Sequence, residues 1–120
     1  MNLFRFPSQF TRQLPAQLIH NDANDGNVLV AASAESPFEL RVSSIVDFGD
    51  MVHAPRICDL AVACTYASLG KPDWLGAAAY VVAGYQAVAP LDERELELLF
   101  DLIRARLCLS VCLCAYQVKH

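Results

Sequence analysis

The hydrophobic and polar positions of the chain divide it into a β-rich part followed by a helical part. Before residue 50 the apolar runs are short: Leu18–Ile19 and Val28–Val30 flank a polar stretch, and a β-type segment follows at Leu40–Val46. The loop between the last two runs contains serine and proline, which are typical of turns. The pattern predicts an antiparallel β-hairpin over residues 28–46, preceded by a connecting segment over the first nineteen residues.

The helical part contains three predicted helices. The first, Ile57–Leu69, is apolar and rich in alanine, and it ends at a glycine with a proline shortly after. The second begins at Asp73 and runs to about Val88, where a proline follows. The third begins at Asp92, which has an acidic residue three positions later, as in a capping box. We expect it to run nearly to the last residue and to bury one apolar face formed by Leu96, Leu99, Phe100, Ile103 and Leu107.

Composition sets limits on the class of protein. The 120 residues suffice for one domain, and 9 basic against 13 acidic side chains give a net charge of −4. This acidic balance argues against a nucleic-acid partner or an anionic membrane surface. The most apolar stretch, residues 98–116, is interrupted by Asp101, Arg104 and Arg106. It therefore predicts a buried helix and no membrane span.

Five cysteines lie among Leu, Val and Ala, which favours buried, unpaired thiols in a reducing compartment. Their spacing lacks the paired motifs of structural zinc sites. The N-terminus has no apolar run of the kind that follows a basic leader in secretory signals. These observations together predict a cytoplasmic protein.

The polar stretch His20–Asn27 allows three interpretations. The first is a simple hairpin turn around Asp25–Gly26, a favoured turn pair. The second is a calcium loop starting at Asp22, but its glycine falls one place early and its twelfth position is Ser33, so the bidentate acid is absent. The third is the catalytic loop of a phosphotransferase, His-x-Asp followed by four residues and Asn.

The phosphotransferase interpretation also requires an Asp-Phe-Gly motif after a hairpin, and Asp47-Phe48-Gly49 meets it. Phosphoryl transfer needs an acceptor hydroxyl aimed at the γ-phosphate and a metal that neutralises phosphate charge. Asp22 would orient the hydroxyl and accept its proton, while Asn27 and Asp47 would supply oxygen ligands to Mg²⁺. We expect His20 to pack under the loop and to hydrogen-bond its backbone.

Two linked motifs carry a family resemblance: LIHNDANDGNVLV and IVDFGDMVHAPRICDLA. They resemble the aminoglycoside phosphotransferase and choline kinase-like family, which shares the protein-kinase-like fold. The most similar branch contains the hydroxylysine kinase-like domains, including those fused to class III aminotransferases. The matching region runs from about Leu14 to Ala63, and the later helices match more loosely.

The resemblance implies an α+β fold, namely the mainly helical C-lobe of a protein-kinase-like fold with a catalytic loop and a metal-binding β-hairpin. It implies Mg²⁺, ATP or GTP as phosphoryl donor, and a small-molecule hydroxyl as acceptor. Asp59 matches the aspartate that braces the catalytic loop through backbone N–H groups, although an ordinary helix N-cap is the alternative. Asp50, His53 and Arg56 are candidates for the acceptor side, with solvated loop residues an equally open interpretation.

The sequence departs from the commonest family pattern at Asn21, where many members have Gly, and at Asn24, where many have His or Lys. A phosphate-covering loop and a phosphate-gripping lysine are also missing, because the lysines are Lys71 and Lys119 and every glycine follows His20. We therefore expect residues 1–120 to be a partial domain without the N-lobe, inactive alone. The alternative is a non-catalytic interaction module that covers its exposed face with a partner chain or a second copy.

Overall fold

The computed structural model describes residues 14–119, with side chains through residue 118. These residues form two small antiparallel sheets followed by three helices, in the order β1, β2, β3, β4, α2, α3, α4. The predicted fold class, α+β and mainly helical, is confirmed. The predicted connecting segment falls mostly on residues outside the described part of the chain.

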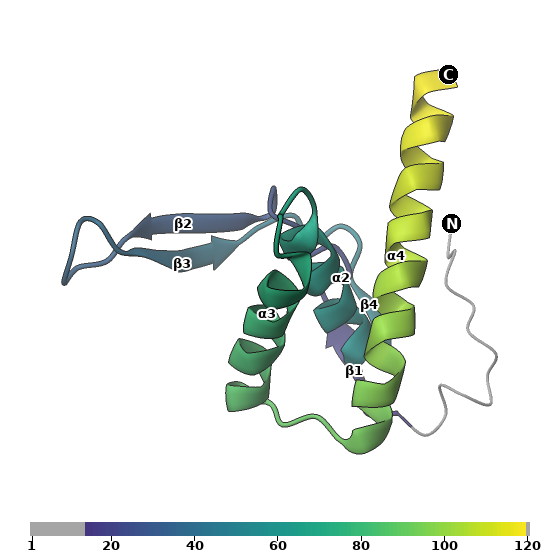
Figure 1. The fold of residues 1–120 in the computed structure, drawn as a ribbon, viewed down its shortest axis with the longest axis horizontal. Coiled ribbons are helices and arrows are strands. Elements are labelled where there is room, and N and C mark those ends of the chain that lie inside the picture. Colours follow the sequence, from purple (N-terminus) through teal and green to yellow (C-terminus); the bar gives the residue numbers. More distant parts are fainter. Residues whose placement is uncertain (1–13, 120) are drawn as a thin grey trace.

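Each sheet is a pair of strands. β2 (Val28–Ala32) pairs with β3 (Leu40–Ile45), which confirms the predicted hairpin, and the register shifts between Leu29 and Val30. The hairpin extends away from the helices (Figure 1) and its strands are largely exposed to solvent. β1 (Ala16–Ile19) pairs with β4 (Val52–Pro55), a strand that the sequence pattern did not predict.

The strand pairing tests whether the polar stretch His20–Asn27 is a simple hairpin turn. Asp25 and Gly26 do form a turn, but the strands on either side of the stretch pair with other strands and not with each other. The hairpin-turn interpretation is therefore wrong. The stretch is a loop that leads from one sheet into the other.

The three helices begin and end close to the predicted residues. α2 (Ile57–Ser68) is followed by Gly70 in the left-handed region at φ 70°. α3 (Trp74–Val88) is capped by Asp73, whose Oδ1 accepts the Gly76 N–H at 2.9 Å. α4 (Glu93–Lys119) begins after a short connection, residues 89–92, that follows α3.

The predicted capping box at the start of α4 is confirmed. The Glu95 N–H donates to Oδ1 of Asp92 at 2.9 Å, and the Asp92 N–H donates back to Oε2 of Glu95 at 3.0 Å. Glu95 also receives Nε and Nη2 of Arg56 at 2.8 and 2.7 Å. Since the Glu95 side chain is fully buried, this ion pair fixes the start of α4 against the residue that precedes α2.

The core surrounds α2, which packs against both α3 and α4 (Figure 1). Every member of its central cluster is apolar, and α2 supplies the four most deeply buried ones. The cluster consists of Ile57, Leu60, Ala61, Cys64, Ala78, Leu91, Leu99 and Leu102. α2 also carries Asp59, which contacts the site described below.

The burial of α4 differs from the prediction in three respects. Leu96 and Phe100 are 44% and 53% exposed, because the face that meets α2 carries Glu95, Leu99 and Leu102. Residues 111–118 are exposed throughout, so residues 98–116 form a buried helix only in their first half. The second half extends past the elements that α4 packs against (Figure 1).

The third difference concerns the cysteines. Cys58 and Cys64 on α2 are partly or fully buried as predicted, but Cys108, Cys112 and Cys114 on α4 are exposed. The prediction of burial was wrong for these three, since Cys108 lies on a face of α4 that no described element covers and Cys112 and Cys114 lie in its exposed final turns. All five thiols are free. None of the described helices is long and apolar enough to cross a membrane.

Candidate functional site

The loop between β1 and β2 is anchored by one carboxylate from α2. The backbone N–H groups of His20 and Asn21 donate to Oδ2 and Oδ1 of Asp59 at 3.2 and 2.8 Å. These are the backbone contacts that the family resemblance implies for this aspartate. The helix N-cap alternative for Asp59 is wrong, because Arg56 occupies the N-cap position and Asp59 lies inside the first turn.

His20 connects the same loop to the end of β3. Its Nε2 lies 2.9 Å from the Val46 carbonyl oxygen, and its Nδ1 lies 3.3 Å from the Asp22 backbone nitrogen. Nε2–H therefore donates and Nδ1 accepts, which defines a neutral imidazole tautomer. Phe48 packs edge-on against the ring at 4.9 Å between centroids. His20 thus lies against the loop backbone, as expected from the sequence.

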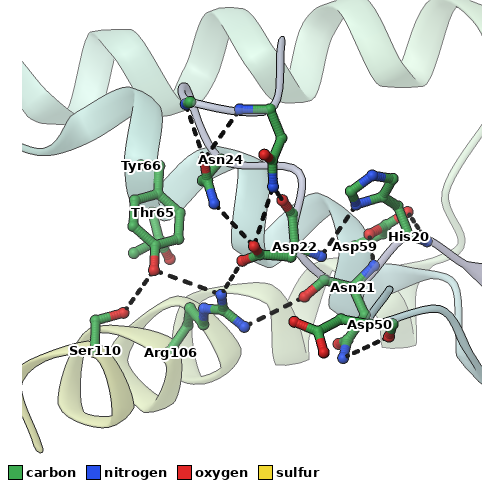
Figure 2. A network of polar contacts seen from close by, with 12 residues as sticks. His20, Asn21, Asp22, Asn24, Asp50, Asp59, Thr65, Tyr66, Arg106 and Ser110 are labelled. Carbon is green, nitrogen blue, oxygen red and sulfur yellow. Dashed lines mark hydrogen bonds and ion pairs between the residues drawn. The ribbon is translucent and has the colours of Figure 1, made fainter. Parts of the chain in front are cut away.

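Asp22 lies at the centre of the polar network in Figure 2. Its Oδ2 accepts the side-chain amides of Asn24 and Asn27 at 3.0 and 3.1 Å, and its backbone carbonyl accepts the Asn27 amide at 2.9 Å. Oδ1 of Asn24 in turn accepts the backbone N–H groups of Gly26 and Asn27. The two asparagines therefore close a tight loop around a single carboxylate, which is held in one orientation.

The base of the hairpin brings Asp47 next to this loop. The Val46 N–H donates to the Asn27 carbonyl at 2.9 Å, so the residue before Asp47 is joined to Asn27 itself, next to the Val28–Ile45 pair of the sheet. Asp47 is exposed and has φ 61°, and its Oδ1 accepts the Gly49 N–H at 3.3 Å. The structure thus brings the backbone at Asp47 close to Asn27, which lies twenty positions earlier in the sequence, while Asn27 contacts Asp22 within the loop.

The residues present fit a magnesium ion that also binds substrate. Within the described chain, no three His, Cys, Asp or Glu side chains gather as a complete protein-built metal site would require. Mg²⁺ needs no such cluster, because it is held by one or two protein oxygens together with waters and phosphate oxygens. The Asn27 amide donates through Nδ2 to Asp22, so Oδ1 is the atom of this amide that would bind a metal, and Asp47 is exposed to solvent.

One residue of the site was missed by the sequence analysis. Arg106 of α4 donates from Nη2 to Oδ1 of Asp22 at 2.7 Å and from Nη1 to the Asn21 carbonyl at 3.3 Å (Figure 2). The sequence showed Arg106 only as a charge that interrupts an apolar run. No local pattern indicates a contact across 84 positions, and only the packing of α4 on α2 brings the two residues together.

The three candidates for the acceptor side have different surroundings. The Asp50 backbone carbonyl accepts Nδ2 of Asn21 at 3.3 Å, so Asp50 lies beside the loop between β1 and β2 (Figure 2). His53 is exposed on β4, opposite Leu18. Arg56 is engaged by Glu95 and by the Pro90 carbonyl, which Nη2 contacts at 2.7 Å. The structure gives Arg56 a role in joining α2 to α4.

The Arg56–Glu95 pair changes the ionisation of both partners. The hydrogen bond from the Arg56 guanidinium lowers the pKa of Glu95, against the opposing effect of burial, and the Asp92 N–H lowers it further. The same hydrogen bond raises the pKa of Arg56. Both groups therefore remain charged around neutral pH, as a paired structural contact.

The loop thus offers a carboxylate that is held by two asparagine side chains and one guanidinium. Such an arrangement suits a reaction in which a hydroxyl is oriented and deprotonated next to metal-bound phosphate. A model of the phosphotransferase enzyme family matches residues 3–99. The chain belongs to that family, and the resemblance drawn from the two motifs is confirmed at this level.

Individual relatives agree with the family assignment. The chain is 38% identical over 104 residues to a hydroxylysine kinase of Xenopus laevis and 37% identical over 99 residues to one of Danio rerio. A hydroxylysine kinase of Bos taurus is 35% identical over 103 residues. These alignments cover 82–83% of this chain but only 27–28% of the relatives. No solved structure gives a significant match.

Proposed function

We propose that this chain is the acceptor- and metal-binding lobe of a small-molecule kinase, which transfers a γ-phosphoryl group from ATP or GTP to an alcohol. The observation that supports this most directly is the Asp22 carboxylate, held by Asn24 and Asn27 at the base of the hairpin that carries Asp47. Phosphoryl transfer relies on positioning and charge neutralisation, and the loop is suited to the positioning.

In the proposed mechanism Asp22 orients the acceptor hydroxyl. The oxygen of that hydroxyl forms a bond to the γ-phosphorus while the bond from the γ-phosphorus to the bridging oxygen of the nucleotide breaks. The hydroxyl proton passes to Asp22. Mg²⁺, held by Asn27 and Asp47, would neutralise phosphate charge. Asp59 and His20 keep the loop in place through their backbone contacts.

We propose a hydroxy amino acid as acceptor, and hydroxylysine first, because the relatives reported above carry the name hydroxylysine kinase. Amino alcohols and aminoglycoside-like compounds are the other acceptors to test. Asp50 and His53 are proposed to line the acceptor side, since Asp50 lies beside Asn21 of the catalytic loop. Five free thiols agree with a proposed location in the cytoplasm.

The proposal requires a nucleotide-gripping lobe in addition to residues 1–120. The catalytic loop is preceded by no lysine and no glycine, and the chain spans 27–28% of the length of its relatives. We propose that further sequence of the same protein, or a partner chain, supplies this lobe. The isolated chain is then inactive or nearly so.

The test compares the 120-residue chain with the full-length polypeptide that contains it. Nucleotide and Mg²⁺ binding are measured by calorimetry, and phosphate transfer is measured on hydroxylysine, amino alcohols and an aminoglycoside. Asp22→Asn should abolish transfer in the full-length protein, whereas Asp25→Asn, an exposed position in the same loop, should leave it unchanged. Absence of transfer by the full-length protein, or an unaffected Asp22→Asn variant, would contradict the proposal.

A second candidate function is a non-catalytic interaction module. The observation in its favour is the number of large apolar side chains that are exposed in the described chain, among them Phe38, Tyr80 and Val118. Where such residues form one contiguous patch, they mark an interface with a partner or a second copy. Stable association with no nucleotide binding, in both the chain and the full-length protein, would favour this function over the kinase.

A further inference from the structure

We propose that Arg106 is a positioning residue for the transfer reaction, and that it fixes the Asp22 carboxylate and supplies the cation beside it. This inference rests on the proposed kinase function. The catalytic loop itself, residues 20–27, contains no lysine or arginine. The guanidinium that contacts Asp22 comes instead from α4, 84 positions later in the sequence.

The guanidinium is held by contacts on several sides. Besides Asp22, Nη1 donates to the Asn21 carbonyl at 3.3 Å and Nη2 donates to the Tyr66 hydroxyl at 3.4 Å. The Tyr66 ring lies under the guanidinium at 5.4 Å, and the Tyr66 hydroxyl lies 2.9 Å from Oγ of Ser110 (Figure 2). Tyr66 on α2 and Ser110 on α4 therefore hold Arg106 in the direction of the loop.

Burial distinguishes this ion pair from the surface pairs of the chain. The Arg106 and Asp22 side chains are 13% and 25% exposed, whereas those of Arg104 and Asp101 on the same helix are 67% and 71% exposed. An exposed pair contributes little, but removing one partner of a largely buried pair leaves an uncompensated charge. Nε of Arg106 is buried with no partner among the described residues, which is itself unfavourable. The favourable contacts at Nη1 and Nη2 offset that cost.

The hydrogen bonds around Asp22 show what this geometry achieves. A carboxylate offers about four lone-pair positions, of which Arg106 uses one on Oδ1 and the two asparagines use two on Oδ2. One position on Oδ1 remains for the acceptor hydroxyl. Without Arg106, no described residue would hold Oδ1 of Asp22 or balance the charge of the carboxylate close to the transferred phosphoryl group.

The experiment uses the full-length polypeptide that contains this chain, with steady-state kinetics on hydroxylysine and the other acceptors. Arg106→Ala should lower kcat about 100-fold, the scale expected for a misplaced catalytic group, with the KM for nucleotide unchanged. Added guanidinium ion should restore part of the kcat of this variant. The kcat of Arg106→Lys should lie between those of the wild type and Arg106→Ala, because lysine keeps the charge but lacks the planar guanidinium. Arg104→Ala is the matched control and should keep the wild-type kcat.

Each outcome bears on a separate conclusion. If the wild-type protein transfers phosphate and Arg106→Ala does so equally well, the role of Arg106 is overturned while the kinase function stands. The role is also overturned if kcat falls without rescue by guanidinium and the melting temperatures of both Arg106 variants fall, since Arg106 would then serve only the packing of α4. If the wild-type protein transfers no phosphate to any acceptor, the proposed function itself fails.

Discussion

Two residues with left-handed backbone conformations lie in the two segments that form the candidate site. Asn21, at φ 66°, immediately precedes Asp22, and Asp47, at φ 61°, begins the Asp-Phe-Gly motif. They are the two non-glycine residues of the described chain with positive φ. Asn and Asp tolerate this region better than other residues because their short polar side chains form local hydrogen bonds. The loop and the hairpin base therefore owe their shapes to specific residues at these two positions.

The first prediction tests the backbone conformation at position 21. Asn21→Val should lower the free energy of unfolding by about 1–2 kcal/mol, since a β-branched residue is disfavoured at positive φ. Asn21→Gly should be tolerated, because it loses only a weak, exposed hydrogen bond to the Asp50 carbonyl. Chemical denaturation of both variants measures the difference. Equal stabilities for the valine and glycine variants would contradict the expected strain.

At the scale of residues, the sequence predicted those parts of the site that lie close together along the chain. His20, Asp22 and Asn27 follow one spacing rule, and Asp47 follows a hairpin that the hydrophobic pattern also predicted. Arg106 could not be predicted, because its contact depends on how α4 packs against α2 and not on any spacing. In the sequence, Arg106 is a charged residue within the apolar stretch 98–116, and nothing near it indicates a contact with Asp22.

At the scale of elements, the helix limits were predictable because they depend on local chemistry. Gly70, Asp73, Pro90 and Asp92 each act within one turn of a helix end. The rotation of α4 about its own axis was less predictable. A spacing of three and four residues defines a broad apolar face, but it does not determine which residues of that face contact α2. β4 was missed because four residues show no clear alternation and its partner strand lies far away in sequence.

The second prediction concerns the ion pair at the start of α4. Glu95→Gln removes the charge that pairs with Arg56, and it should lower the free energy of unfolding at pH 7 by about 3 kcal/mol. Glu97→Gln, an exposed position on the same helix, is the matched control and should change stability by less than about 0.5 kcal/mol. Urea denaturation of the two variants and the wild type measures both effects.

The same pair predicts a dependence of stability on pH. The Arg56 hydrogen bond lowers the pKa of Glu95 in the folded state below its unfolded value of about 4.3. The contribution of Glu95 is therefore complete above the unfolded pKa and is lost as the pH falls through the folded pKa. The difference between wild type and Glu95→Gln should shrink as the pH is lowered from 5 to about 2. A constant difference over this range would show that the charge of Glu95 is not what stabilises the contact.

At the scale of the whole molecule, packing is unequal along the chain. α2 is enclosed between α3 and α4, while the β2–β3 hairpin and the second half of α4 extend away from the core (Figure 1). The sequence predicted the elements but not which of them are covered. The spacing of apolar residues is the same on a helix that other elements cover and on one that they leave exposed. The five cysteines sample both environments, since two lie on α2 and three on the open part of α4.

The third prediction uses these thiols to measure the packing. Burial raises the pKa of Cys58 and Cys64 to about 11, with the charge of Asp59 adding to the effect at Cys58, so few thiolates are present there at pH 8. The three α4 cysteines are exposed. In the native 120-residue chain, a thiol reagent followed by mass spectrometry should therefore label Cys108, Cys112 and Cys114 rapidly and the α2 thiols only on unfolding. Rapid labelling of Cys64 would contradict the described core. In the full-length polypeptide, slower labelling of the three α4 cysteines would show that additional sequence covers this helix.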